Sequence, residues 1–345
     1  MALANIDQKG VSVVICCFNS SQRIVPTIEH LCQQKDIDFP WDVILVDNNS
    51  TDGTAEIAWE TWQKDKGSCP FHIIKELKPG TMYARKKGIE MSNYRYLLYC
   101  DDDNWFHEHY VKTAFSIISK DENISAVGGC GILEFELDFS PPQWVEKFKK
   151  TFGAGPQGNI DGDTTHGKGC LYTAGAILDR VWLDRLYNFG FTSSLKGRDG
   201  KSLVAGEDTE LTYALKLIGG KLFYSSEMHF RHFMPSGRIT WSYVKKMWRS
   251  FGYSDFLISP YVIYFKKRRQ HAFAGIMLQG IIGLAKSFAR AASASFAEGN
   301  KNVLQFQRSV GEFKAAFSNY KTFVRNQQMV ANLSRHIKNE GIEKT

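Results

Sequence analysis

Three consecutive carboxylates, Asp101, Asp102 and Asp103, directly follow the apolar segment 96–100 and could bind a metal ion. An apolar run of this length is typical of a buried strand in the centre of a sheet. Open α/β sheets bind ligands at the carboxyl ends of their strands, and adjacent carboxylates repel one another unless a cation or a shared proton relieves them. Mg2+ takes carboxylate ligands and bridges them to substrate phosphates. The run therefore indicates a divalent-metal site, and a solvated acidic turn is the alternative.

Other polar residues stand where they could complete such a site. Asp47 ends the apolar segment 41–46, so we expect it at the same carboxyl edge of the sheet. Glu207 and Asp208 open a helical pattern, where the helix dipole favours negative charge, so helix capping alone would account for one of them. His232 follows in a later segment, and an imidazole near a carboxylate site can complete metal coordination. A hydrogen-bonded structural histidine is the alternative there.

Strand and helix patterns alternate along the first part of the chain. The strand patterns cover 11–18, 41–46, 71–75 and 96–100. Their alternation with helical patterns predicts a mainly parallel sheet with right-handed crossovers, and hence an α/β fold. Arg85, Lys86 and Lys87 lie in the helical pattern just before the acidic strand. They either face the same ligand as the carboxylates or form a solvated helix face.

The composition indicates a globular protein with one large domain and an extension. Of 345 residues, 43% are hydrophobic and 23% charged. Because strand patterns stop near residue 250, we expect a catalytic domain over 1–250 and a helical extension over 251–345. The net charge of +7 favours a polyanionic partner, either a nucleotide phosphate, nucleic acid or an anionic membrane surface. The seven cysteines include no Cys-x-x-Cys pair and are typical of reduced core thiols in a cytosolic protein.

The extension contains a basic, amphipathic segment. The segment 273–288 keeps helical apolar spacing and follows the basic residues 266–269. It is too short and too interrupted to span a bilayer, which takes about 20 apolar residues. Such a helix can instead lie on an anionic bilayer, and packing on the catalytic domain is the alternative. No apolar core of a signal peptide precedes residue 11. We therefore expect a cytoplasmic protein that contacts the inner face of the cytoplasmic membrane peripherally.

Taken in order, these motifs resemble family 2 glycosyltransferases of the GT-A fold, of the type that builds bacterial surface polysaccharides. The resemblance extends from residue 11 to about residue 252. Its motifs are 13–19, 46–54, Gly80 with Ala84 and Arg85, 97–103, and 206–208 followed by His232 and Arg238. Each motif alone is weak, whereas all of them in this order are specific. The resemblance implies a Rossmann-like, mainly parallel sheet flanked by helices that binds a nucleotide-diphospho-sugar.

For the donor, the resemblance implies a site at the first two strands. Asp47 would read the nucleobase, with help from the backbone near Phe18 and Asn19, and Arg85 would contact the nucleotide. Uridine diphosphate is the commonest donor nucleotide in such enzymes, although guanosine or deoxythymidine donors would use much the same loops. The family often has asparagine in place of Lys86, so the contacts to the diphosphate are the least determined.

The same resemblance implies a divalent metal, Mg2+ or Mn2+. Asp101 and Asp103 would be the two ends of the Asp-x-Asp signature, with Asp103 the more direct ligand and Asp101 nearer the ribose. Asp102 stands with the donor-binding residues. His232 resembles the histidine that many members place near the diphosphate, and it completes the expected ligand set.

The implied reaction is an inverting transfer. Asp208 would act as general base on an acceptor hydroxyl, and Glu207 would bind the acceptor or hold the base. The acceptor would be a glycan or a lipid-linked molecule, and the resemblance implies no nucleic-acid partner. A glycoside hydrolase could use the same carboxylates, but the Asp-x-Asp strand end argues against it because such a hydrolase needs no metal or nucleotide. The glycine-rich, basic N-terminal signature of a nucleotidyltransferase is absent, since the chain has Cys17-Phe18-Asn19-Ser20 there. The alternative that stays open is a non-catalytic nucleotide-sugar binder or membrane scaffold of the same fold.

Overall fold

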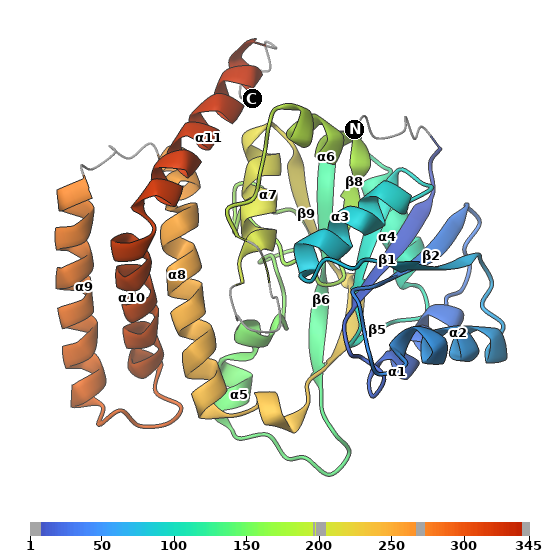
Figure 1. Cartoon of the computed structure of the whole chain (residues 1–345), viewed down its shortest axis with the longest axis horizontal. Coiled ribbons are helices and arrows are strands. Elements are labelled where there is room, and N and C mark those ends of the chain that lie inside the picture. The colour runs from blue at the N-terminus through green and yellow to red at the C-terminus, as the bar shows by residue number, and fades with distance from the viewer. Residues whose placement is uncertain (1–7, 196, 198–204, 267–272, 340–345) are drawn as a thin grey trace. The chain divides into compact units, whose positions relative to one another are not determined.

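The structure, a computed structural model, describes residues 8–195, 197, 205–266 and 273–339 (Figure 1). The chain packs into two compact units. Unit 1 comprises 1–134, 152–188 and 219–234, and unit 2 comprises 135–151, 189–218 and 235–345. The boundary expected at residue 250 lies inside one continuous helix, α8 (Trp241–Phe265), because earlier segments pack with the C-terminal helices. The functional division into 1–250 and 251–345 stays a prediction.

Unit 1 is built on a mixed, mostly parallel sheet. Its nine strands in the described chain have the order β3-β2-β1-β4-β8-β6-β9-β5, with β7 beside β9. Neighbours among β1 to β4 are parallel, and β8 runs antiparallel to both β4 and β6. The strands are β1 (Val11–Cys17), β2 (Trp41–Asp47), β3 (Phe71–Lys75), β4 (Tyr96–Asp101), β5 (Asn104–Phe106), β6 (Ile124–Glu134), β7 (Gly162–Asp163), β8 (Ile177–Asp179) and β9 (Lys221–Phe233). The α/β fold predicted from the alternating patterns is confirmed.

The helices of unit 1 cover this sheet and leave its carboxyl edge to the loops (Figure 1). They are α1 (Ile24–Cys32), α2 (Thr54–Lys64), α3 (Thr81–Met91), α4 (Tyr110–Ile118) and α6 (Arg180–Asn188). Strands β1, β2 and β4 are buried along almost their whole length, which explains why they are continuous apolar runs. On α1, the spacing of Ile24, Ile28 and Leu31 puts three fully buried side chains on one face. Burial on both sides fixes the strands and therefore positions their terminal loops.

Unit 2 is helical in its described residues. Its elements are α5 (Trp144–Lys147), η1 (Lys149–Phe152), α7 (Glu207–Leu217), η2 (Ser236–Arg238), α8, α9 (Phe273–Ser293), α10 (Lys301–Ser318) and α11 (Tyr320–Asn339). Helices α8 and α10 approach each other so closely that glycine is required at their crossing. A Cβ on Gly252 would lie 1.8 Å from the carbonyl oxygen of Arg308, and one on Gly311 would lie 1.9 Å from that of Arg249. The amphipathic segment expected at 273–288 is part of α9, while 267–269 of the basic run lie outside the described residues.

Among the residues that the structure describes, no helix is both long enough and apolar enough to cross a membrane.

Candidate functional site

The parallel strands of unit 1 bring two of the predicted residues to one edge of the sheet. Cys17, the last residue of β1, pairs with Asp47 of β2, and Cys16 pairs with Asp101 of β4. Because the three strands are parallel and in this register, Asp47 and Asp101 lie on either side of β1 at the same edge. The structure thus brings together the two acidic loops, as their sequences predict.

The loop after β1 is hydrogen-bonded to the loop after β2. The backbone N–H of Asn19 donates to Ser50 Oγ at 3.0 Å, and that of Thr51 donates to Asn19 Oδ1 at 2.9 Å. Asn19 has a φ of 47°, a left-handed conformation that asparagine adopts more readily than most residues. The ring of Phe18 is half-exposed beside this turn. Phe18 and Asn19 therefore lie at this carboxyl edge of the sheet, and their contact with a nucleobase stays a prediction.

Asp47 and its neighbour Asn48 order the second loop. Asp47 is buried, and its Oδ1 accepts a hydrogen bond from the Ser50 N–H at 2.9 Å. Asn48 donates through Nδ2 to the carbonyl of Lys78 at 2.7 Å and accepts from the Gly80 N–H at 2.8 Å. Gly80 has a φ of 126° and begins helix α3. Asn48 thereby fixes the start of the helix that carries Arg85.

Arg85 projects from α3 toward the central strands. Its guanidinium lies 5.2 Å from the centre of the Tyr99 ring of β4. Burial raises the pKa of the Cys16 thiol of β1 to about 12, against the opposing charge of Arg85 nearby. Arg85 is therefore a cation next to the strands that end in Asp47 and Asp101, and its contact to a nucleotide stays a prediction.

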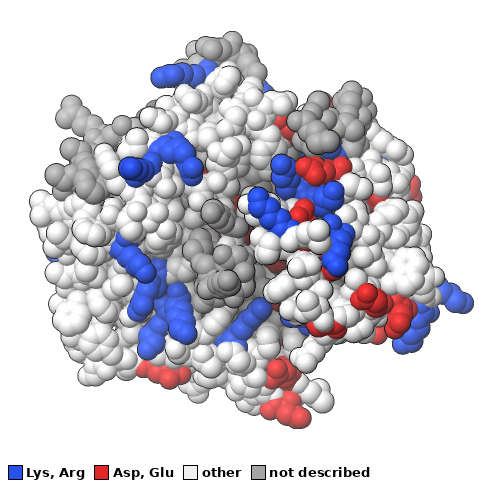
Figure 2. Space-filling model, viewed as in Figure 1, with Lys and Arg blue, Asp and Glu red and all other residues white. Residues whose placement is uncertain are grey.

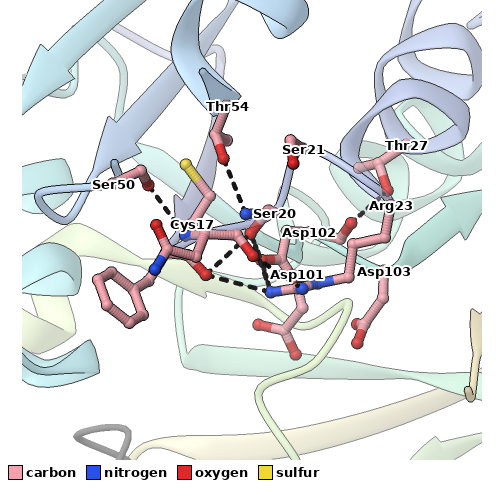
Figure 3. A network of polar contacts seen from close by, with 12 residues as sticks. Cys17, Ser20, Ser21, Arg23, Thr27, Ser50, Thr54, Asp101, Asp102 and Asp103 are labelled. Carbon is pink, nitrogen blue, oxygen red and sulfur yellow. Dashed lines mark hydrogen bonds and ion pairs between the residues drawn. The ribbon is translucent and has the colours of Figure 1, made fainter. Parts of the chain in front are cut away.

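The middle carboxylate of the acidic run faces helix α1 (Figure 3). Arg23 donates to Asp102 through Nε at 3.0 Å and Nη2 at 2.7 Å, and Ser20 Oγ donates to it as well. Thr27 Oγ1 donates to the backbone carbonyl of Asp102 at 3.0 Å. In Figure 3 dashed lines join Asp102 to this network, whereas the side chains of Asp101 and Asp103 point to the lower part of the view.

Asp102 is a buried, ion-paired carboxylate. Its side chain is 13% exposed and that of Arg23 is 26% exposed. Burial raises the pKa of Asp102, the charge of Asp103 adds to this, and the hydrogen bond and charge of Arg23 oppose it. With both oxygens held by Arg23 and Ser20, Asp102 positions the acidic turn. Its predicted contact to the donor stays a prediction.

The third carboxylate approaches the predicted histidine. Asn104 of β5 pairs with His232 of β9, and this register brings His232 Nε2 to 3.4 Å from Asp103 Oδ1. Asn104 Nδ2 lies 3.3 Å from the same oxygen, and the Phe233 N–H donates to the Asp103 carbonyl at 2.9 Å. Both Asp103 and His232 are largely buried. The structure therefore assembles two members of the expected ligand set from segments about 130 residues apart.

A divalent metal ion needs several ligand atoms close together. In the described part of the chain, His, Cys, Asp and Glu side chains form no group of three in ligand geometry. Mg2+ is, however, commonly bound by one or two carboxylates plus substrate phosphates. Asp103 and His232, 3.4 Å apart, supply two donors of the kind that such an ion takes together with a diphosphate. Asp101, Asp103 and His232 as ligands stay a prediction.

Glu207 and Asp208 lie in unit 2, in the first turn of α7. Gly206 precedes them with a φ of 109°, a conformation that favours glycine. Asp208 Oδ1 accepts a hydrogen bond from the Thr209 N–H at 2.7 Å, so its carboxylate lies against the start of the helix. Their roles as base and acceptor-binding residue stay predictions.

Glu210, three residues after Glu207, is the acid of this helix that the structure buries. It accepts hydrogen bonds from Ser193 Oγ at 2.6 Å, the Ser194 N–H at 2.9 Å and Ser194 Oγ at 2.8 Å. Burial raises the pKa of Glu210, and these hydrogen bonds oppose the shift. Asn326 of α11 donates to Ser194 Oγ at 2.9 Å and so joins the C-terminal helix to the same turn.

Sequence reasoning missed the residues that hold the loops in place. Besides Arg23 and Glu210, Asp52 accepts hydrogen bonds from the N–H groups of Ser21 and Thr54. Burial alone would raise the pKa of Asp52, but the hydrogen bonds from Thr54 and Ser21 outweigh it and lower the pKa to about 2. The signal available was the Asp52-Gly53-Thr54 sequence before a helix, because an aspartate side chain readily accepts a hydrogen bond from the backbone two residues on.

The segment that forms this edge of the sheet matches a known protein family. Residues 12–186, slightly more than half of the chain, match the family described as glycosyl transferase family 2. The chain belongs to glycosyl transferase family 2. The matched segment contains the β1, β2 and β4 loops and the Asp101–Asp103 run, and it confirms the resemblance drawn from the motifs.

Individual relatives match over a shorter segment. Glycosyltransferase GlyG of Streptococcus pneumoniae is 26% identical over 118 residues, which are 34% of this chain and 38% of the relative. Poly(ribitol-phosphate) beta-N-acetylglucosaminyltransferase TarP of Staphylococcus aureus is 23% identical over 124 residues, 36% of this chain and 37% of TarP. The match thus spans less than two fifths of the length of these relatives.

A solved structure extends the likeness to the fold. The mannosyltransferase PcManGT from Pyrobaculum calidifontis, in complex with GDP-Man and Mn2+, aligns with a TM-score of 0.53 and 15% identity. The alignment covers 96% of this chain and 89% of PcManGT. At this identity the likeness concerns the fold, and it agrees with the GT-A fold expected from the sequence.

Proposed function

We propose that this protein is a metal-dependent, inverting glycosyltransferase of polysaccharide biosynthesis. It would transfer a sugar from a nucleoside-diphosphate donor to a hydroxyl group of a glycan or lipid-linked acceptor. The observation that carries the proposal is the shared carboxyl edge of β1, β2 and β4, where Asp47 and Asp101 flank β1 in a chain of family 2. The activities for which TarP and PcManGT are named, both glycosyl transfers, support the reaction class.

The donor would lie along this edge. Asp47, Phe18 and Asn19 form the first two loops, where we place the nucleobase, and Arg85 supplies a positive charge to the nucleotide. We place a uridine nucleotide first on the family resemblance, and a guanosine nucleotide second because PcManGT is described with GDP-Man. Both use the same kind of loop, so the base is a question for binding measurements.

The transfer needs a cation that stabilises the negative charge of the leaving diphosphate. It also needs a general base for the hydroxyl group of the sugar acceptor. Asp101, Asp103 and His232 would hold Mg2+ or Mn2+, which when bound stabilises the negative charge of the diphosphate. Asp208 would take the proton from the acceptor hydroxyl as its oxygen attacks the anomeric carbon. Glu207 would hold the acceptor or the base. A single displacement of this kind inverts the anomeric configuration.

Calorimetric titration tests the donor site. The purified protein is titrated with uridine, guanosine and deoxythymidine diphosphates and their sugars, with Mn2+ and with chelator. We expect one nucleotide to bind in a metal-dependent way, and Asp103→Ala to lose about tenfold or more in affinity because a charged ligand is removed. Asp138→Ala, a change of an exposed aspartate outside the site, serves as matched control. Absence of binding by every nucleotide, with metal present and the fold intact by circular dichroism, would contradict the proposal.

A further inference from the structure

Helix α9 carries apolar side chains on the face that does not pack against the protein. Its inner face contacts α10: Ser287 and Ala291 are buried, and a Cβ on Gly280 would lie 3.8 Å from the ring of Phe313. Its outer face presents large apolar side chains with exposed fractions of 59% for Leu278, 51% for Ile281, 44% for Ile282 and 50% for Phe288. At 100° per residue, Leu278, Ile281 and Ile282 lie within about 60° of the point opposite Ser287, whereas Phe288 lies about 100° from Ser287, at the border with α10.

Aromatic rings continue this face at the end of α9. The ring of Phe288 lies 5.4 Å from that of Phe306 of α10, and the ring of Phe296 lies 5.9 Å from Phe288. Phe296 is 44% exposed, so two of the three rings reach the surface. Single exposed apolar side chains are common on protein surfaces, whereas a contiguous group such as this one marks an interaction site.

The charges around this face have one sign. Helix α9 contains no Asp or Glu, and its charged residues, Lys286 and Arg290, are exposed along one flank of the apolar side chains. The sequence from 256 to 297 contains no acidic residue. Figure 2 shows the surface over α9 without Asp or Glu on the side in view, and Lys and Arg side chains beside it over α8 and α10. An apolar helix face whose own helix carries cations and no acidic residue is complementary to a surface that is apolar beneath and anionic at its edge.

We propose that the outer face of α9 docks on an anionic lipid bilayer, with Leu278, Ile281, Ile282 and Phe288 inserted at the level of the acyl chains. Lys286 and Arg290 then lie at the level of the lipid phosphates. Among the described helices none could cross the membrane, so the contact is one of a helix lying in the interface. A second copy of the chain is the less suitable occupant, because a symmetric contact would place the same cations close to one another.

This contact goes beyond the proposed transfer reaction and does not depend on it. None of its residues lies in unit 1 or in the first turn of α7, so vesicle binding can be measured without donor and donor binding without vesicles. A bilayer surface would also concentrate a lipid-linked acceptor, which is one of the two acceptor classes of the proposed function. Failure of docking and failure of the donor site are therefore separate results.

Vesicle co-sedimentation of the full chain tests the contact. The probes are phosphatidylcholine vesicles with and without phosphatidylglycerol, at low and high salt. We expect the wild type to bind the anionic vesicles, Leu278→Gln/Ile282→Gln to bind at least about tenfold more weakly, and Lys286→Gln/Arg290→Gln about fivefold more weakly. Leu77→Gln/Leu137→Gln changes two leucines outside α9 that are 68% and 100% exposed, and it is the matched control, expected to bind like the wild type.

Three results would overturn the proposal. The wild type could stay in the supernatant with anionic vesicles at low salt. The Leu278→Gln/Ile282→Gln variant, shown to be folded by near-ultraviolet circular dichroism, could bind as tightly as the wild type. Light scattering could instead reveal a dimer that this variant separates, with no vesicle binding, in which case a second copy covers the face.

Discussion

Two acidic clusters of the molecule, Asp101–Asp103 in unit 1 and Glu207–Glu210 in unit 2, are built on the same plan with different partners. In each cluster one buried carboxylate accepts hydrogen bonds from other protein groups. The remaining carboxylates stand at the start or end of a helix or strand. In unit 1 the internal acid, Asp102, is paired with the Arg23 cation, 79 residues earlier in the chain. In unit 2 the internal acid, Glu210, accepts hydrogen bonds from uncharged donors of residues 193–195, 15 to 17 positions earlier.

This difference shows two ways of holding a buried carboxylate in place. An ion pair such as Arg23–Asp102 ties together elements that are distant in sequence, but it leaves a buried charge behind when either partner is removed. A set of hydroxyl and N–H donors such as those around Glu210 is weaker per bond and holds a turn close in sequence. In both clusters the internal acid positions its neighbours, and our proposal assigns the chemistry to the outer acids Asp103 and Asp208. Three substitutions of decreasing expected effect test this assignment.

The largest effect is expected for the outer acid of unit 2. Asp208→Asn keeps the shape of the side chain and the acceptor for the Thr209 N–H, but it removes the proposed base. We expect kcat to fall by about 10^2- to 10^4-fold while the Kd of the donor stays unchanged. Steady-state kinetics and donor calorimetry on the same preparations measure the two quantities, with Asp138→Asn as control. Equal losses in kcat and donor affinity would instead make Asp208 a donor-binding or structural residue.

The next effect concerns the internal acid of unit 1. Arg23→Met leaves Asp102 buried without its cation, so we expect the free energy of unfolding to fall by about 3 kcal/mol, the lower end of the range for a broken buried pair because Arg23 is partly exposed. Arg23→Met/Asp102→Leu removes both charges and should recover most of that loss. Urea denaturation midpoints at equal slope measure the change. A loss below about 0.5 kcal/mol in the single variant would show a solvated surface pair.

The strands and their terminal acids were predictable from the sequence because they depend on local patterns. Continuous apolar runs identify β1, β2 and β4, and a strand that ends in a carboxylate places that carboxylate at the sheet edge whatever the rest of the chain does. The proximity of His232 to Asp103 was a hypothesis from the residue types and the family resemblance, since the β5–β9 register that creates it has no local signal.

The partners of the internal acids and the composition of the two units could not be predicted. Nothing in Asp101–Asp103 shows which carboxylate turns toward α1, because this depends on where Arg23 lies after folding. Likewise Trp144 belongs to unit 2 because its ring packs against Trp241 and its Nε1 donates to Glu298 at 2.6 Å, contacts that span about 100 and 150 residues. Such contacts are decided by packing, and helical periodicity does not record them.

The smallest effect is expected for Glu210, and its sign follows from the raised pKa. Below its ordinary value of 4.5, Glu210 is protonated in both the folded and the unfolded chain. Above it the unfolded chain loses the proton first, so the folded state holds more protons and the stability contributed by Glu210 declines as pH rises, until pH passes the raised folded pKa.

The variant Glu210→Gln has no such titration but keeps a similar shape. The difference in unfolding free energy, wild type minus Glu210→Gln, should therefore decrease by about 1 kcal/mol or less as pH is raised from 4.5 through this window, and then level off. Urea midpoints across that range measure it, and Asp138→Asn should show no comparable trend. An increase with pH would mean that the donors of residues 193–195 outweigh burial and depress the pKa of Glu210. The comparison with Asp102 would then change, because uncharged donors alone would suffice to hold an ionised carboxylate inside unit 2.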